Sequence, residues 1–129
     1  MDIKKICDNE IYSNKDIPIS ISKDILNFAE SGFKEIETSK KVLELFKSLG
    51  QKKIDTEIAL TGLKTTLDTG REGPNIAVIG ELDGLPVPGH PYENKENGYA
   101  HACGHHAQIG SIFTVFMGLS NRKILNNLC

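Results

Sequence analysis

The sequence predicts an α/β domain in which helices cover both faces of a mostly parallel central sheet. Apolar residues recur at helical spacing before residue 50 and again after residue 104, whereas the part between them is typical of short strands and turns. Within that part, residues 75–80 form a nearly continuous apolar run, as in a strand buried in the middle of a sheet. This order of helices, strands, loop and helix indicates a three-layer α/β/α architecture.

Three helices are expected before residue 50. The first covers about residues 2–11. The second is capped by Ser20 or Ser22, because a hydroxyl at that position accepts a hydrogen bond from a free backbone N–H, and Gly32 interrupts it. The third ends at Gly50, since glycine suits the left-handed conformation that often follows a helix. Its inner stripe is expected to consist of Ile36, Leu43, Phe46 and Leu49.

Strands and a final helix are expected after residue 50. Residues 53–59 and 63–67 are predicted to be strands, and residues 71–74 a turn. Residues 104–119 are predicted to form the last helix, with an inner face made of Ile109, Ile112, Phe113 and Phe116. No repeat or low-complexity linker interrupts the sequence. We therefore expect one domain over residues 1–129 and no second domain.

Composition excludes several classes of partner. The net charge is −2, so the chain lacks the basic excess that usually accompanies nucleic-acid binding. No apolar run approaches the length of a membrane span, and no membrane partner is expected. The three cysteines, Cys7, Cys103 and Cys129, are odd in number and far apart, which argues against a disulfide framework. A reducing cytoplasm is the expected compartment.

The segment from His101 to His106, with the sequence His-Ala-Cys-Gly-His-His, is the strongest functional signal. Three imidazoles and a thiol within six positions indicate a site for a divalent metal such as zinc, cobalt or manganese. Glu81 and Asp83 follow residues 75–80, so both carboxylates are expected to project from the carboxyl end of that strand, where ligand sites form in open sheets. The start of the final helix would also favour a thiolate at Cys103.

The candidate residues differ in how strongly they point to metal. Cys103 and His105 are the favoured ligands, although a free cysteine can also be a small buried filler. His106 is a further candidate. Whether it lies beside the metal, faces substrate or faces solvent is left open. His101 is expected to brace the loop by hydrogen bonding. Asp83 either orients a metal ligand or caps the loop.

These residues resemble the metal-dependent amidohydrolases of the aminoacylase and carboxypeptidase clan. The similarity is greatest to the branch that holds hippurate, auxin-conjugate and aminobenzoyl-glutamate hydrolases, and it runs from about residue 25 to residue 118. The similar blocks are residues 28–33 with 37–39, residues 61–63, residues 80–86 and residues 101–105.

The resemblance implies a catalytic domain with two metal ions that cleaves the amide bond of N-acyl amino acids or small peptides. Cys103 and His105 match positions that bind metal in the family, and Asp83 matches a carboxylate that orients a ligand. Glu81 stands where the wider clan has a histidine ligand. The family's general base is a glutamate of a Glu-Glu pair well downstream, and this sequence has no Glu or Asp after Glu96.

The chain is therefore expected to be the amino-terminal part of such an enzyme, without the base, the remaining ligands or the smaller domain that makes dimer contacts. The alternative is a catalytically inactive, truncated chain that acts as a metal- or partner-binding module. The complete enzyme is expected to act on a small-molecule amide and to form a homodimer. The fragment itself is expected to self-associate, because an incomplete sheet exposes an edge.

Overall fold

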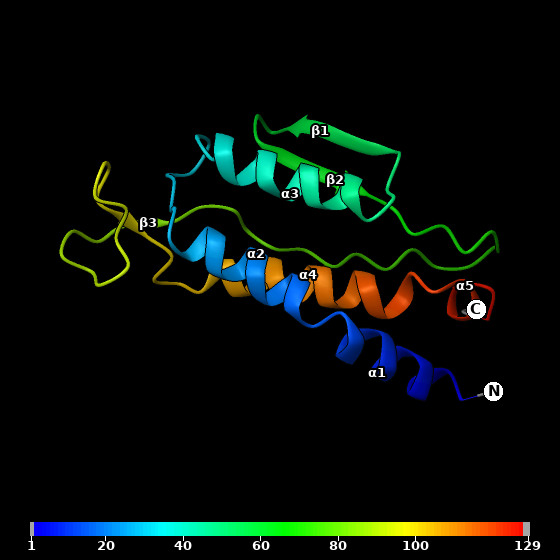
Figure 1. Ribbon diagram of the computed structural model, residues 1–129. Helices are drawn as coiled ribbons and strands as arrows, with labels where there is room; N and C mark the ends of the chain where they lie inside the picture. Colours follow the sequence, from blue (N-terminus) through cyan, green and yellow to red (C-terminus); the bar gives the residue numbers. More distant parts are fainter. Residues whose placement is uncertain (1, 128–129) are drawn as a thin grey trace.

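The computed structural model describes residues 2–127 of the chain (Figure 1). Within that range the elements in chain order are α1 (Ile3–Ser13), α2 (Asp16–Leu26), α3 (Ile36–Ser48), β1 (Ile54–Ile58), β2 (Gly62–Thr65), β3 (Leu85–Pro86), β4 (Tyr99–Ala100), α4 (His105–Leu119) and α5 (Arg122–Leu125). The chain thus has an α/β fold with short strands. Among the described residues, no helix combines the length and the apolarity needed to cross a membrane.

The hydrophobic core lies where α4 meets α2 and α3. The ring of Phe46, on α3, lies 4.4 Å from that of Phe113 and meets that of Phe116 edge-on at 5.4 Å, measured between ring centroids. Aromatic pairs of this kind contribute about 0.5–1.5 kcal/mol beyond the burial of their area. The buried members of the core are Ile21, Ile25, Val42, Phe46, Ile109, Phe113, Phe116 and Met117. α1 and α2 both pack along α4, which is therefore the central helix of the described chain.

The expected first, third and last helices are confirmed. The carboxylate of Asp2 caps α1 by accepting a hydrogen bond from the backbone N–H three residues later. α3 ends at Ser48, and Gly50 follows two residues later with a φ of +89°, the left-handed conformation expected there. Three of the four residues expected on the inner face of α4 are buried, namely Ile109, Phe113 and Phe116.

The start of α2 and the inner side of α3 differ from the prediction. α2 begins at Asp16, so Ser20 and Ser22 lie inside the helix instead of capping it. Pro18 stands in its first turn, where the N–H that proline lacks would have no partner within the helix. On α3 the buried residues are Thr38, Val42 and Phe46. Ile36 is 62% exposed, because the stripe that faces α4 begins two residues later.

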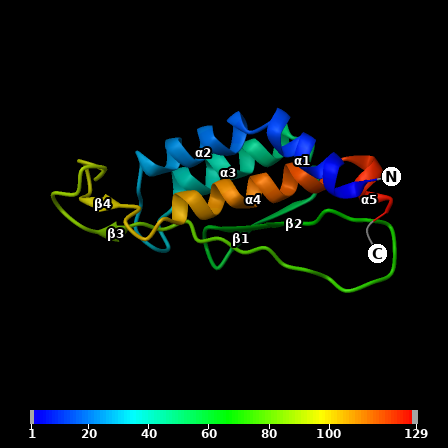
Figure 2. The same cartoon turned by 90° about the horizontal axis from the view of Figure 1, so that it is seen from below.

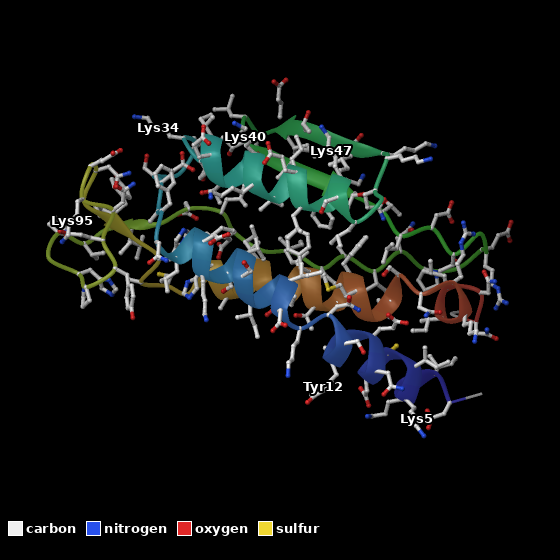
Figure 3. All side chains as sticks on the ribbon, viewed as in Figure 1. Lys5, Tyr12, Lys34, Lys40, Lys47 and Lys95 are labelled. Atoms are coloured by element: carbon white, nitrogen blue, oxygen red, sulfur yellow. The ribbon has the colours of Figure 1, made fainter. Side chains whose placement is uncertain are left out.

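Charged and polar side chains lie on the outer surface. Lys40 and Lys47 lie on the outer side of α3, and Lys5 and Tyr12 on the outer side of α1 (Figure 3). The ammonium group of Lys15 lies 4.3 Å from the centre of the Tyr12 ring, at the junction of α1 and α2. These contacts are peripheral and leave the core apolar.

A carboxylate from outside α3 caps its first turn. Glu30 accepts hydrogen bonds from the backbone N–H and from the hydroxyl of Thr38, both at 2.8 Å. The Thr61 hydroxyl donates to the buried carboxylate of Glu35 at 2.6 Å, and the Ser39 hydroxyl donates to the Thr61 carbonyl oxygen at 2.7 Å. These bonds satisfy backbone groups that a helix start leaves free and fix the β1–β2 hairpin to α3.

Both sheets within residues 2–127 are two-stranded and antiparallel. β1 pairs with β2, with Ile54 opposite Thr65, as expected for a hairpin, and β3 pairs with β4. Parallel pairing among the described residues is limited to one bridge, between Ser31 and Gly84. The structure therefore has small antiparallel sheets at the places where a larger, mostly parallel sheet was expected.

Residues 75–80 differ most from the prediction. They were expected to form a buried strand, but they belong to no strand, and Ile76 and Ile79 are 88% and 85% exposed. Figure 2 shows that this segment and the β1–β2 hairpin lie on the same side of the helices. It contacts α4 at Gly80, where a Cβ atom would lie 2.7 Å from the side chain of Ile112. An apolar run is buried in a sheet only where strands flank it, and the described residues supply none here.

Gly84 joins the part of the chain that carries the carboxylates to the segment before α3. Its N–H donates to the carbonyl oxygen of Glu30 at 2.7 Å. A Cβ atom on this residue would lie 2.8 Å from the Cβ of Ala29 and 3.0 Å from the carbonyl oxygen of Ala100. Three segments that are distant in sequence therefore meet at a point that has no room for a side chain.

Substituting Gly84→Ala is expected to lower the free energy of unfolding by about 1–3 kcal/mol, because the added methyl group must displace backbone. Urea unfolding followed by circular dichroism measures the change. Gly32→Ala is the matched control, since a Cβ there meets its nearest atoms at 4.0 Å. Equal stability of the two variants would show that the contact at Gly84 is not close.

Candidate functional site

The candidate site lies at the end of the molecule where α4 begins. In Figure 1 the start of α4, strand β3 and the chain before α3 all lie at this end. Asp83 and Gly84 immediately precede β3, and His101 immediately follows β4. The short β3–β4 pair thus brings residues 81–84 and 101–106, which are about twenty positions apart in the sequence, to the same end of the fold.

His105, the first residue of α4, lies between two carboxylates. Its Nδ1 atom is 2.7 Å from the carbonyl oxygen and 3.1 Å from a carboxylate oxygen of Asp83. Its Nε2 atom is 2.9 Å from a carboxylate oxygen of Glu81. A carbonyl oxygen only accepts, so Nδ1 carries the proton that it donates to Asp83. In the neutral ring this leaves the lone pair of Nε2 facing the Glu81 carboxylate.

The contact between Nε2 and Glu81 places two acceptors face to face when the imidazole is neutral. Such a pair attracts only when a proton or another cation lies between its members. The arrangement can therefore hold a positive charge at this point, either on the protonated ring of His105 or on a bound metal ion. Nitrogen and carboxylate donors together suit zinc and similar ions.

Gln108 holds Glu81 in place and was missed by the sequence analysis. Its side-chain oxygen accepts a hydrogen bond from the Glu81 N–H at 3.0 Å, and its side-chain nitrogen donates to the Glu81 carboxylate at 3.3 Å. Gln108 lies three residues after His105, so both side chains share one face of α4. Placing His105 at the first position of the helix is the signal that could have identified Gln108.

His101 and His106 form a separate pair. Their ring centroids are 5.9 Å apart. His101 is only 4% exposed, and neither of its ring nitrogens has a hydrogen-bond partner among the described residues. The Nδ1 atom of His106 is likewise buried and without a partner there. The ring thus makes no hydrogen bond of standard geometry among the described residues, although the Asp83 backbone is near enough to act on its pKa as an acceptor.

Burial also makes these two rings difficult to protonate. It is the main cause that lowers the pKa of His101 to about 4, and the neighbouring charges of His106 and His105 add to it. Burial, followed by the charge of His105, lowers the pKa of His106 as well. Both imidazoles are accordingly neutral at neutral pH, which is the form that binds metal ions.

The predicted ligands are not gathered into one group. Among residues 2–127, no three Cys, His, Asp or Glu side chains lie close enough together to hold a metal ion. Cys103 is exposed, one residue before Gly104, which precedes α4 with a left-handed φ of +84°. His105 lies with Glu81 and Asp83, whereas His106 lies with His101. Of the other cysteines, Cys7 is half-buried in α1, and Cys129 lies outside the described residues.

The loop between β3 and β4 is fixed by two asparagines. The side-chain amides of Asn94 and Asn97 both donate to the carbonyl oxygen of Ala29, at 3.3 Å and 3.0 Å. Ala29 is fully buried and also lies against Gly84. The loop that leads to His101 is thus anchored to the same segment that carries the cap of α3.

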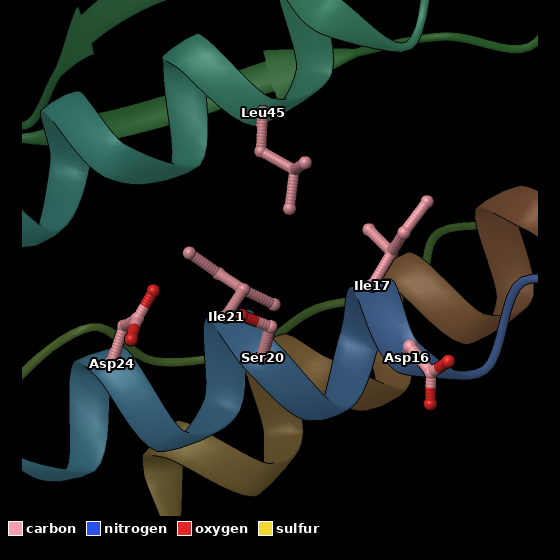
Figure 4. A pocket seen from close by; sticks show the side chains of 6 residues that line it. All are labelled: Asp16, Ile17, Ser20, Ile21, Asp24 and Leu45. Carbon is pink, nitrogen blue, oxygen red and sulfur yellow. The ribbon is translucent and has the colours of Figure 1, made fainter.

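A hollow of about 330 Å³ lies elsewhere, between α2 and α3 (Figure 4). Ile17 and Ile21 of α2 point toward Leu45 of α3 across it, and Asp16 and Asp24 lie at its edge. None of its lining residues belongs to the candidate site. It is a gap between two helices that diverge.

Comparison with known proteins agrees with the motifs. No family model matches the chain. It is 30% identical to N-acetylcysteine deacetylase of Bacillus subtilis over 81% of its own length and 28% of the relative's. It is 28% identical to N-acetyldiaminopimelate deacetylase of Brevibacillus brevis, over 84% of its own length and 29% of the relative's. It is also 28% identical to thermostable carboxypeptidase 1 of Saccharolobus solfataricus, over 98% of its own length and 33% of the relative's.

The fold is also similar to a solved structure. A crystal structure described as an aminohydrolase from methicillin-resistant Staphylococcus aureus superposes with a TM-score of 0.78 at 27% identity, over 90% of this chain and 30% of that one. The chain thus resembles this class of protein in both sequence and fold.

The chain belongs to the amidohydrolase and peptidase family that includes these deacetylases and this carboxypeptidase, within the aminoacylase and carboxypeptidase clan. The predicted family is thereby confirmed, although these relatives are not the hippurate, auxin-conjugate or aminobenzoyl-glutamate hydrolases of the predicted branch. The chain spans about three-tenths of the length of the curated relatives that it matches.

The free energy of unfolding is expected to fall as the pH is lowered from neutral toward about 4 in the presence of a chelator. The unfolded chain takes up a proton on His101 near pH 6.5, whereas the folded chain does not until about pH 4. Unfolding is therefore favoured by proton uptake within this window, by on the order of 2–3 kcal/mol at its acid end. Urea unfolding at a series of pH values measures the slope.

His101→Gln removes the group that titrates. Between neutral pH and about 4, its free energy of unfolding should therefore fall by about 2–3 kcal/mol less than that of the wild type. His90→Gln is the control, because His90 lies in the β3–β4 loop, where its Nδ1 accepts a hydrogen bond from the Tyr92 N–H. Identical slopes for the wild type and His101→Gln would contradict the buried, neutral state of His101.

Proposed function

We propose that the chain supplies part of the catalytic domain of an enzyme that hydrolyses the amide bond of N-acyl amino acids or small peptides with the help of a metal ion. The observation that carries the proposal is the placement of His105 between the carboxylates of Glu81 and Asp83, at the start of α4. The family to which the chain belongs supports amide hydrolysis as the reaction class.

Cys103 and His105 are the proposed ligands of a metal ion, and Glu81 and His106 are further candidates. The donor types suit an ion of this kind, because Asp83 accepts the Nδ1 hydrogen bond of His105 and leaves Nε2, which faces Glu81, as the nitrogen that could bind it. When bound, a zinc, manganese or cobalt ion lowers the pKa of a water molecule and polarises an amide carbonyl. We propose two such ions in the complete enzyme.

The remaining residues of the site are proposed to position these ligands. Asp83 fixes the tautomer and the direction of the His105 ring through its main chain and its carboxylate. Gln108 holds the backbone and the carboxylate of Glu81 through two hydrogen bonds. The Ser31–Gly84 bridge and the hydrogen bond from the Gly84 N–H to Glu30 are proposed to hold the backbone next to Asp83 in place.

We also propose that residues 75–80, which belong to no strand here, become a strand of a mostly parallel central sheet with helices on both sides in the complete enzyme. The segment already packs on α4 at Gly80, and Ile76 and Ile79 remain exposed. Such side chains are buried once neighbouring strands and a second layer of helices cover them. The cytoplasm stays the predicted compartment, and a homodimer the predicted state of the complete enzyme.

The second candidate function is that of a metal- or partner-binding module without catalysis. Its support is that no three metal-binding side chains meet among the described residues. A site with two protein ligands binds an ion but leaves hydrolysis without a general base.

Turnover and metal binding, measured on the same sample, separate the two functions. The chain is incubated with zinc, manganese or cobalt, and release of acetate from N-acetyl amino acids is followed beside equilibrium dialysis of the metal. Turnover that disappears in Cys103→Ser and His105→Ala, but persists in His90→Ala, supports hydrolysis. Metal binding with zero turnover supports the module, and absence of both contradicts the proposed site.

Exposed apolar residues predict that the chain self-associates in solution. Light scattering is expected to give a mass above that of the monomer, because residues 75–80 present Ile76 and Ile79 on an unpaired extended segment. The double variant Ile76→Thr/Ile79→Thr should shift the mass toward the monomer. Ile19→Thr, at an exposed position of α2, is the control that should not. A monomeric wild-type chain would refute the expectation.

A further inference from the structure

The hollow between α2 and α3 has a lining that the proposed function does not use. Its floor is aliphatic and consists of Ile17 and Ile21 of α2 and Leu45 of α3. Ile21 is buried, whereas Ile17 and Leu45 are half-buried and remain in contact with water. Displacing that water with another apolar group is favourable. The volume of about 330 Å³ is that of a small-molecule site, so the hollow suits a ligand with an aliphatic part.

One rim of the hollow carries a regular row of polar side chains. Asp16, Ser20 and Asp24 follow one another at intervals of four positions along α2, and all three line the hollow (Figure 4). This spacing keeps side chains on one face of a helix. At a rise of about 1.5 Å per residue, the two aspartates start about 12 Å apart along the axis, with Ser20 midway. The rim thus presents a carboxylate, a hydroxyl and a second carboxylate in line.

The two carboxylates of the rim have no cationic partner in the described part of the chain. Neither Asp16 nor Asp24 forms an ion pair there. The ammonium group of Lys15 lies over the Tyr12 ring, 4.3 Å from its centre, and Lys41 on α3 forms no ion pair among the described residues. Carboxylates that flank apolar surface in this way attract a positively charged ligand.

The spacing of the carboxylates favours a linear cation over a metal ion. Magnesium and calcium ions bind oxygen at about 2.0–2.6 Å, so a single ion cannot bridge side chains that start about 12 Å apart. A methylene chain with an ammonium group at each end can reach both carboxylates and lay its apolar part on the aliphatic floor. Spermidine has this form, with a secondary ammonium group between its ends. Its charges and methylene groups therefore alternate as the rim and the floor require.

We propose that the hollow between α2 and α3 binds a linear aliphatic polyamine, whose terminal ammonium groups pair with Asp16 and Asp24. Its methylene groups lie on Ile21 and Leu45, and the Ser20 hydroxyl accepts a hydrogen bond from the ammonium group between the ends. The inference is independent of the proposed function, because no residue of the candidate site lines the hollow.

Equilibrium dialysis of spermidine against the full chain tests the proposal, at low ionic strength and with a chelator present. Saturable binding of one molecule per chain is the expected result. Diaminooctane, with an amine at each end, is the matched ligand, because its terminal groups are as far apart as those of spermidine but no charge lies between them. Diaminopropane is too short to reach both aspartates. Affinity should fall in the order spermidine, diaminooctane, diaminopropane.

Substitutions at the rim should weaken binding in a ligand-dependent way. Asp16→Asn and Asp24→Asn should each weaken spermidine by up to about fivefold, as expected for an exposed ion pair, and the double variant by more than either. Ser20→Ala should weaken spermidine and leave diaminooctane unchanged. Asp55→Asn is the matched control, since it removes the same charge from an exposed position on β1 and should change neither affinity. Circular dichroism shows that each variant is folded.

Three outcomes would overturn the proposal. If Asp55→Asn weakens spermidine as much as the rim variants do, the attraction reflects net charge alone. If diaminopropane binds as tightly as spermidine, one ligand does not bridge the two aspartates. If no saturable binding occurs and the double variant Asp16→Asn/Asp24→Asn lowers the mass measured by light scattering, a second copy of the chain occupies the hollow instead. None of these results bears on the metal binding and turnover that test the proposed function.

Discussion

The close approach at Gly84 is the constraint on which the site depends. Its N–H binds the Glu30 carbonyl oxygen, and its Cα lies against Ala29 and Ala100 with no room for a side chain. Asp83 is its neighbour on one side, and the Glu30 side chain caps α3 on the other. The carboxylate that contacts His105 and the start of α3 are therefore fixed at a single junction, so a shift there would move both. The asparagines of the β3–β4 loop strengthen it through Ala29.

The parts of the fold that could be predicted are those whose signal is local. The positions of α1, α3 and α4 and of Gly50 depend on one helix at a time, and these were predicted correctly, although the inner face of α3 was not. The beginning of α2 was not, because two serines suggested a cap where Pro18 had already started the helix. Residues 75–80 carry the pattern of a buried strand, but burial depends on flanking strands, which a local pattern cannot supply.

The site shows the same division. Residue types alone identified a cluster capable of binding metal, but they did not indicate which side chains lie together. The sequence groups His105 with His106, whereas in the fold His105 faces Glu81 and Asp83, and His106 faces His101. Consecutive residues at the start of a helix point in directions about 100° apart, so side chains that are neighbours in the sequence contact different parts of the fold. The contribution of Gln108 depends on the same helical register and is not visible without it.

The structure also divides the family resemblance into two kinds of motif. Glu30, Thr38 and Thr61 belong to the early blocks, and their contacts cap α3 and attach the hairpin, so they account for the fold that the chain shares with its relatives. Residues 81–83 and 101–106 bring imidazole and carboxylate groups into direct contact at one end of the molecule. Similarity in the first group is evidence for the scaffold, and similarity in the second is evidence for chemistry. The proposed hydrolysis therefore depends on the second group, and above all on the contacts of His105 with the carboxylates of Glu81 and Asp83.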